Sequence, residues 1–273
     1  GSASQHNTYL PKMARGETTA CIAISEPQGG GHPKYLTTTA EPDGSNYFIT
    51  GEKTFLTNAP LADLFIVFAV VGKDDEKKRF SAFLVPKASD GLTMGDTLDF
   101  GFLHPCPHAG IILDRCPVRA DAILGRPGSA YEDMALMFRQ VEDTMMMGPI
   151  SGGIRAQLDR LVHLIQDQTV PLREDLDARL GEIASTASAL EILTLEAARM
   201  LENEGHPELT PILIFCRKLA AQTQTQFKEL IGGAGIVTDT LYDLMTNDMV
   251  RCLRIAANVA AIKQKKLGRA MLL

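Results

Sequence analysis

The sequence has few cysteines and no long apolar run, and no signal peptide is recognisable in it. Its five cysteines are widely spaced and form no Cys-x-x-Cys pair: Cys21, Cys106, Cys116, Cys216 and Cys252. This pattern favours free thiols in a reducing compartment and argues against a disulfide framework or a structural zinc site. Because no apolar stretch reaches the length of a membrane span, we expect a cytoplasmic protein that does not cross a membrane.

Basic segments with interleaved aromatic residues are also missing. The net charge is −6, which argues against nucleic acid as a general partner. Lysine and arginine cluster only near the end of the chain, at Lys263, Lys265, Lys266 and Arg269. Cations are favoured near the C-terminus of a helix, so this cluster is explained without a nucleic-acid ligand.

Apolar periodicity divides the chain into three parts. Residues 1–16 are predicted to form a short helix that ends at Tyr9-Leu10-Pro11. Residues 17–127 alternate short strands with turns, which is typical of a β-sandwich or barrel. Within this part, the continuous apolar run at residues 64–71 predicts a central, buried strand.

Residues 128–273 are predicted to be helical. Apolar residues recur at three- and four-residue spacing, for example at Leu176, Leu180, Ile183 and Ala187, which places them on one helix face. Helices are expected at residues 129–165, 172–204, 208–231 and 247–271. The predicted fold class is therefore α+β multidomain, a β domain followed by an antiparallel four-helix bundle.

Two segments of the β domain carry an unusual pattern. Residues 20–31 run from an apolar strand through Ser25-Glu26-Pro27 into three consecutive glycines, which allow a ligand to approach the backbone closely. Residues 51–58 form a second predicted strand, which could present Phe55 as a flat apolar face and Thr57 as a hydroxyl donor. Together they could form one wall for a planar, partly polar cofactor that carries phosphate.

These segments resemble two motifs of the acyl-CoA dehydrogenase family. Ser-Glu-Pro with its glycines is similar to that family's Thr-Glu-Pro-Gly-Ala-Gly-Ser turn, and the segment from Lys53 to Asn58 is similar to its Lys-x-Trp-Ile-Thr-Asn strand. The resemblance implies FAD as cofactor. It assigns six residues of the β domain to the flavin: Ile24, Ser25, Gly30, Gly31, Phe55 and Thr57. Phenylalanine in place of tryptophan at Phe55 keeps a stacking face.

The resemblance extends over the order of the domains. It implies that residues 17–127 are the middle domain, that residues 128–273 are the C-terminal helical domain, and that residues 1–16 are the end of an N-terminal helical domain. Whether the chain is naturally short or a fragment stays open. Gly232 and Gly233 resemble the family's Gly-Gly-x-Gly, which approaches the FAD of a neighbouring subunit; the alternative is a helix C-cap and turn.

A carboxylate base is needed for the family's reaction, in which an α-proton is removed from an acyl-CoA thioester while hydride passes to flavin. The usual glutamate position falls on Ala256, which cannot take up a proton. A minority of the family places the base in a Glu-Arg pair on the first helix of the bundle, and Glu142-Asp143 is the matching pair here. Glu142 is therefore the candidate base; the alternative is a solvated residue or an ion pair with Arg139.

The segment His104-Pro105-Cys106-Pro107-His108 contains histidine and cysteine, which are residue types that bind metals. No further histidine or cysteine cluster supplies a third and fourth ligand, so no metal is predicted.

Two functions remain open from the sequence. The first is FAD-dependent α,β-dehydrogenation of an acyl-CoA by a homodimer or homotetramer, with an electron-transfer flavoprotein as acceptor. The alternative is a catalytically degenerate relative that acts as structural partner in a hetero-oligomer with a flavin-bearing subunit. It is motivated by Ala256, by Asp143 in place of the arginine, and by the loss of the family's Arg-x-x-Phe-Gly near residues 163–167.

Overall fold

The computed structural model describes residues 1–75, 77–103, 105–168, 170, 174–202 and 206–272. Its elements group into two compact units, residues 1–137 and residues 138–273, and each is described by itself. The first contains the described strands and the N-terminal helix, and the second consists of helices, so the predicted order of a β domain and a helical bundle is confirmed. The sequence placed the change in composition near residue 128; the units divide between Met137 and Phe138.

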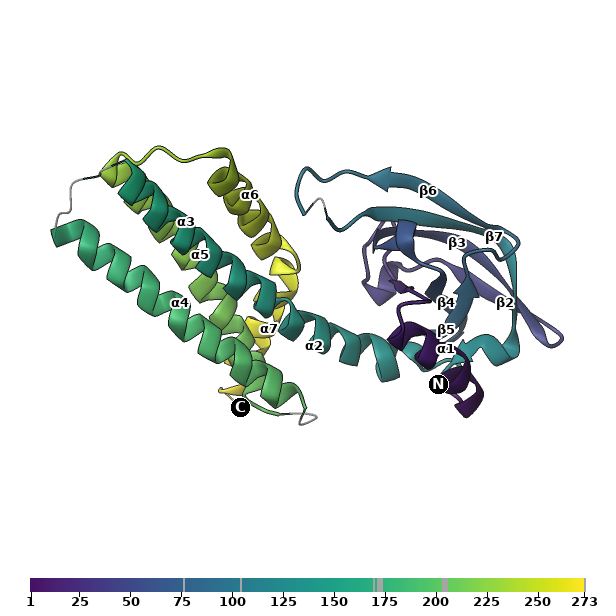
Figure 1. Cartoon of the computed structure of the whole chain (residues 1–273). Helices are drawn as coiled ribbons and strands as arrows, with labels where there is room; N and C mark the ends of the chain where they lie inside the picture. The colour runs from purple at the N-terminus through teal and green to yellow at the C-terminus, as the bar shows by residue number, and fades with distance from the viewer. Residues whose placement is uncertain (76, 104, 169, 171–173, 203–205, 273) are drawn as a thin grey trace. The chain divides into compact units, whose positions relative to one another are not determined.

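The strands of the first unit form one mixed sheet (Figure 1). Its described strands are β1 (Ala20–Ala23), β2 (Thr39–Asp43), β3 (Asn46–Thr57), β4 (Leu64–Asp74), β5 (Lys77–Pro86), β6 (Leu92–Leu98), β7 (His108–Arg119) and β8 (Ile123–Leu124). The order is β6-β7-β3-β2-β4-β5-β8, and β1 pairs with β4. Both β1 and β2 run parallel to β4, whereas the other pairs are antiparallel. Short 3-10 turns lie at Pro33–Tyr35, Ala59–Leu61 and Ala120–Ala122.

Local sequence explains the centre of this sheet. The turn after Asp43 closes the β2–β3 hairpin, in which Asp43 faces Asn46. The apolar run in β4 is central, as predicted, because β1, β2 and β5 all pair with it. Its residues contribute to two buried clusters, one around Phe65 and Val67 and the other around Phe68. Alternate side chains of a strand point to opposite faces, so the buried strand supports both clusters.

The N-terminal helix α1 (Ala3–Ala14) is longer than the sequence predicted. It does not end at Pro11, which lies inside the helix. Ser2 and Gln5 form a capping box at its start. The Gln5 amide also donates to the carbonyls of Asp121 and Ile123, at 3.0 and 2.9 Å, which fastens α1 to the β unit.

The described helices from Leu136 onward are α2 (Leu136–Met145), α3 (Met147–Asp167), α4 (Glu174–Leu201), α5 (Leu209–Ala234), α6 (Thr240–Arg254) and α7 (Ala257–Ala270). Three of the four predicted helices, the first, the third and the fourth, differ from the prediction. The first predicted helix is a π-helical turn, Tyr131–Ala135, followed by α2 and α3. The third does not end at Gly232-Gly233 but continues to Ala234 and is capped by Gly235, whose φ is 66°. The expected ends of the second helix, residues 172–173 and 203–204, lie outside the described residues.

The fourth predicted helix is two helices. Residues 247–271 were expected to be continuous, but α6 ends at Arg254 and α7 begins at Ala257. Ala256 lies between them in the left-handed region, with φ 55°. Arg217 on α5 donates to the carbonyl of Leu253 at 3.0 Å and to that of Ile255, so a tertiary contact satisfies the end of α6.

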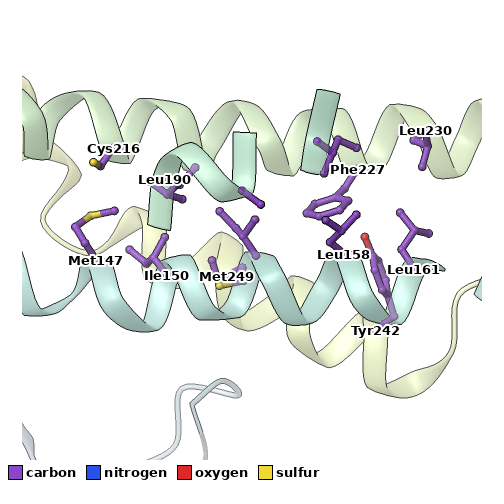
Figure 2. Packing of buried hydrophobic residues seen from close by; sticks show 14 of the residues in the cluster. Met147, Ile150, Leu158, Leu161, Leu190, Cys216, Phe227, Leu230, Tyr242 and Met249 are labelled. Carbon is purple, nitrogen blue, oxygen red and sulfur yellow. The ribbon is translucent and has the colours of Figure 1, made fainter. Parts of the chain in front are cut away.

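The bundle core explains the apolar periodicity (Figure 2). Met147 and Ile150 on α3, Leu190 on α4 and Phe227 on α5 are buried, and Phe227 meets the ring of Tyr242 from α6 edge-on at 6.4 Å between centroids. The predicted face of α4 is confirmed, since Leu176, Ile183, Ala187, Leu190 and Ala197 are all buried. No helix among the described residues is both long and apolar enough to cross a membrane.

Candidate functional site

The two segments singled out in the sequence lie next to each other in the first unit. The Thr54 amide donates to the Ser25 carbonyl at 2.9 Å, and Lys53 Nζ donates to the Ile24 carbonyl at 3.1 Å. Strand β3 is therefore joined directly to the residues that follow β1. The structure thus brings the predicted residues Ile24 and Ser25 beside the strand that carries Phe55 and Thr57.

A buried ion pair holds these segments together. Lys53 Nζ lies 2.8 Å from Glu26 Oε1, and the two side chains are 0% and 3% exposed. Three further donors complete the carboxylate: the Thr37 amide at 2.6 Å, the Thr37 hydroxyl at 2.8 Å and the Thr38 amide at 3.0 Å. A buried charge is tolerated only when it is paired and hydrogen-bonded in this way.

The carboxylate of this pair is kept ionised. Burial alone would raise the pKa of Glu26, but Lys53 and the threonine donors outweigh it and lower the pKa to about 2. Burial lowers the pKa of Lys53, and Glu26 opposes that shift. This pair could not be identified from the sequence, because the burial of Lys53 within a strand is a tertiary effect. The only signal in the sequence was that one motif contains an acidic residue, Glu26, and the other a basic residue, Lys53.

The glycines of the turn at residues 29–31 have no side chains that could cover the backbone. Glu26 and Gly30 exchange backbone hydrogen bonds of 3.1 and 3.0 Å, and Gly30 has φ 57°. A Cβ on Gly29 would lie 2.3 Å from Cβ of Tyr35, so no larger residue fits there. Gly30 and Gly31 are half-buried. Because Gly30 and Gly31 carry no side chains, a ligand could approach the backbone closely near the end of β1.

Phe55 and Thr57 both point to the exposed side of β3. Phe55 is 53% exposed, whereas Leu56 between them is 2% exposed. Pairing of β3 with β7 is irregular between Lys53 and Leu56, and Phe55 has φ 57°. Such a bulge changes the direction in which a side chain points. The result is a large apolar ring, held by a costly backbone conformation, on an open surface.

Around Phe55 lie residues that the sequence did not assign to the site. The ring of Phe100 is 6.1 Å from that of Phe55 and 5.1 Å from that of His108, between centroids. His108 Nε2 is 3.0 Å from Thr57 Oγ1. The sequence grouped His108 with His104 and Cys106; His104 lies outside the described residues. Among the described residues no group of three or more His, Cys, Asp or Glu is arranged to hold a metal ion.

A cavity of about 390 Å³ opens next to the glycine turn, within the first unit. Phe80 and Tyr131 form part of its apolar lining, and His32, Lys34, Lys77 and Lys78 lie at it. One carboxylate, Glu132, pairs with Lys77 at 2.7 Å. Lys78 Nζ donates to the carbonyls of Lys34 and Leu36, at 2.9 and 2.6 Å. The described lining is thus apolar with an excess of positive charge.

The candidate base lies in the second unit. Glu142 lies near the end of α2. The residue as a whole is exposed, but protein atoms crowd its carboxyl, and this partial loss of solvent is the main reason why its pKa is raised. Repulsion by Asp143 acts in the same direction, and Arg139 opposes both. Asp143 itself pairs with Lys263 of α7 at 2.5 Å. The negative charge that the sequence identified at Asp143 is therefore balanced by a lysine.

The remaining predicted residues also belong to the second unit. Gly232 and Gly233 lie in the last turn of α5, before its cap at Gly235. Ala256 stands at the exposed start of α7, the helix that carries Lys263. The Asp143–Lys263 pair thus joins the segment of Glu142 to the helix that begins at the family's usual base position.

Comparisons with known proteins agree with this architecture. The family described as "Acyl-CoA dehydrogenase, middle domain" matches residues 21–116. The chain is 28% identical over 253 residues to the short-chain specific acyl-CoA dehydrogenase of Sus scrofa, covering 88% of this chain and 60% of that protein. It is 25% identical over 287 residues to the 3-(aryl)acrylate reductase of Clostridium sporogenes, covering 100% of this chain and 74% of that protein.

A solved structure shows the same fold. The butyryl-CoA dehydrogenase of Megasphaera elsdenii superposes with a TM-score of 0.85 at 20% identity, covering 100% of this chain and 73% of that one. The chain spans about 60% of the length of the short-chain dehydrogenase it matches. The chain is therefore similar in sequence to acyl-CoA dehydrogenases and has the fold of one of them, and its residues 21–116 match that family's middle domain.

Proposed function

We propose that this chain is an FAD-dependent enzyme of the acyl-CoA dehydrogenase type. The observation that carries the proposal is the wall around β3. Two motifs are locked together by the Glu26–Lys53 pair, and they expose Phe55 and Thr57 beside a side-chain-free glycine turn. A flat apolar ring next to a glycine turn and a hydroxyl suits a cofactor that is planar, partly polar and phosphorylated.

The residues present fit FAD. Phe55 offers the stacking face, with Thr57 and the backbone at Ile24 and Ser25 beside it. Gly30 and Gly31 leave room for a phosphate close to the peptide groups. Gly232 and Gly233 would approach the cofactor of a neighbouring subunit in a homodimer or homotetramer.

Glu142 is proposed as the base that takes up the α-proton of an acyl-CoA thioester. A raised pKa makes a carboxylate a stronger base, provided that it is ionised at the working pH. When bound, FAD supplies the acceptor for the hydride that leaves the β-carbon. An electron-transfer flavoprotein is proposed to reoxidise the enzyme.

The cavity beside the glycine turn supports acyl-CoA as the substrate class. Its lysines and histidine suit phosphate groups, and its apolar floor of Phe80 and Tyr131 suits a base or an alkyl chain. Lys77 forms an ion pair with Glu132, so Lys34 and Lys78 are the lysines of the cavity that could bind a ligand. Lys78 donates to two carbonyls, which leaves one of its three hydrogens for a ligand.

An FAD titration tests the proposal. The purified chain is expected to show flavin absorption bands or to take up added FAD to about one per chain. Phe55→Ala should weaken FAD binding by about 1–3 kcal/mol, because aromatic stacking on a planar base is of that size. Phe55→Trp, which keeps the stacking face, should bind like the parent. A colourless chain that takes up no FAD would contradict the proposal.

The alternative is a catalytically degenerate subunit that supports a flavin-bearing partner. Ala256, exposed in a break between two helices, favours it, because the usual base cannot act there. This alternative predicts that the chain co-purifies with a flavin-bearing subunit. A stable homo-oligomer that is loaded with FAD and reduced by butyryl-CoA would exclude it.

A further inference from the structure

His108 lies directly opposite Thr57 in the antiparallel pairing of β3 and β7. Residues that face each other in such a ladder are close enough for their side chains to interact. Here Thr57 Oγ1 and His108 Nε2 are 3.0 Å apart, which is hydrogen-bonding distance. The histidine therefore contacts a hydroxyl that belongs to the proposed flavin wall.

A second hydrogen bond fixes the state of the ring. His108 Nδ1 lies 2.7 Å from the Cys106 carbonyl, which can only accept, so Nδ1 carries the hydrogen. In the neutral imidazole Nε2 is then an acceptor, and the Thr57 hydroxyl donates to it. The oxygen of Thr57 is left with lone pairs for a ligand. This reverses the role of donor that the sequence analysis expected for Thr57.

The orientation of His108 is also held by packing. The edge of its ring meets Phe100 at 77° between the ring planes, with the centroids 5.1 Å apart. Phe100 in turn lies against Phe55. The imidazole is therefore restrained by a carbonyl, a hydroxyl and an aromatic ring, from three different parts of the chain.

We propose that His108 is a positioning residue that turns the Thr57 hydroxyl into a hydrogen-bond acceptor toward the flavin. The inference rests on the proposed function, since it requires FAD at this wall. Reduction adds hydrogen to a ring nitrogen that only accepts hydrogen bonds in the oxidised flavin. A wall that accepts hydrogen bonds therefore matches the reduced ring better than the oxidised ring, and His108 favours the reduced state.

The decisive experiment compares the midpoint potential of bound FAD in four proteins: the parent, His108→Ala, Thr57→Val and the double variant. Without His108 the Thr57 hydroxyl is free to donate to the oxidised ring. We expect a roughly tenfold shift of the redox equilibrium toward oxidised flavin, which is about 30 mV for a two-electron couple. His108→Gln should recover part of the shift, because its amide oxygen can accept from Thr57.

The double variant separates this role from a general loss of structure. Because His108 acts through Thr57, adding His108→Ala to Thr57→Val should change the potential no further. His6→Ala, a change at an exposed histidine of α1, should leave the potential at the parent value. An unchanged potential in His108→Ala, or an equal shift in both backgrounds, would overturn the proposal.

A measurement without flavin tests the hydrogen bonds directly. In the FAD-free protein, the ¹⁵N chemical shifts of His108 should show a protonated Nδ1, and Thr57→Val should move the Nε2 signal. Hydrogen on Nε2 in the neutral ring would overturn the proposal. If the parent binds no FAD at all, the proposed function fails and the flavin role of His108 fails with it. FAD binding with an unaltered potential removes the role of His108 alone.

Discussion

Two lysine–carboxylate pairs, one in each unit, differ in burial and in surroundings. Glu26 and Lys53 are 3% and 0% exposed, and three donors from Thr37 and Thr38 complete the carboxylate. Asp143 and Lys263 are 16% and 29% exposed, and beside them stands Glu142 with a raised pKa. The first pair fixes the backbone of a wall. The second balances charge next to Glu142, the proposed base.

The difference follows from solvation. A fully buried pair cannot lose one partner without leaving an uncompensated charge in the protein, so its contribution is structural. A partly exposed pair is screened by water. Removing one partner therefore changes the electrostatic potential at neighbouring groups more than it changes the free energy of unfolding. The predictions below test this contrast.

The largest effect is expected at Glu142. Replacing it by glutamine removes the proposed base while keeping shape, and general bases contribute about 10²–10⁴-fold to rate. Anaerobic reduction of bound FAD by butyryl-CoA should slow by that factor, with FAD still bound. Gln140→Glu, on the same helix, is the control for a change of charge without loss of the base. A Glu142→Gln variant that is reduced as fast as the parent would remove the assignment.

The next effect concerns Lys53. Replacing it by methionine strands Glu26 in the interior, which typically costs about 3–5 kcal/mol. Urea unfolding should show this loss, and FAD uptake should weaken with it. Lys73→Met is the matched control, because Lys73 also lies in a strand but is exposed. The double variant Glu26→Gln/Lys53→Met should be more stable than Lys53→Met alone; a less stable double variant would argue against the pair.

Acid should act through the same pair. The pKa of folded Glu26 is lowered to about 2 from an ordinary value of 4.5, so its stabilisation is complete above about pH 4.5. Between pH 4.5 and 2 the unfolded chain binds a proton that the folded chain does not, and stability falls. Comparing urea midpoints of the parent and Glu26→Gln isolates this contribution, because the other carboxylates are shared. Parallel midpoint curves across that window would contradict the lowered pKa.

The smallest effect is expected at Asp143 and Lys263. Asp143→Asn removes a negative charge beside Glu142 and releases Lys263, so both changes should lower the pKa of Glu142. Lys263→Gln leaves Asp143 unbalanced and should raise it. The pH midpoint of FAD reduction by butyryl-CoA should therefore move in opposite directions in the two variants. Shifts of the same sign would show that the pair does not act on Glu142.

Much of the fold follows from local pattern. The β2–β3 hairpin follows from its turn, and the buried face of α4 follows from spacing near 3.6 residues. The break at Ala256 could not be predicted, because nothing in the local sequence stops the helix there. Arg217 on α5 satisfies the carbonyls of Leu253 and Ile255, directly before Ala256, and such a contact is invisible until the helices pack.

For the candidate site, the sequence determined that two motifs place an aromatic ring, a hydroxyl and three glycines in one domain. Motifs are local, so the residues Phe55, Thr57 and Gly30 could be named directly. Only the tertiary structure decided that Lys53 is buried against Glu26, that Lys263 balances Asp143, and that His108 faces Thr57. The physical reason is that burial, ion pairing and hydrogen-bond direction depend on neighbours distant in sequence, which strand register and helix packing bring together.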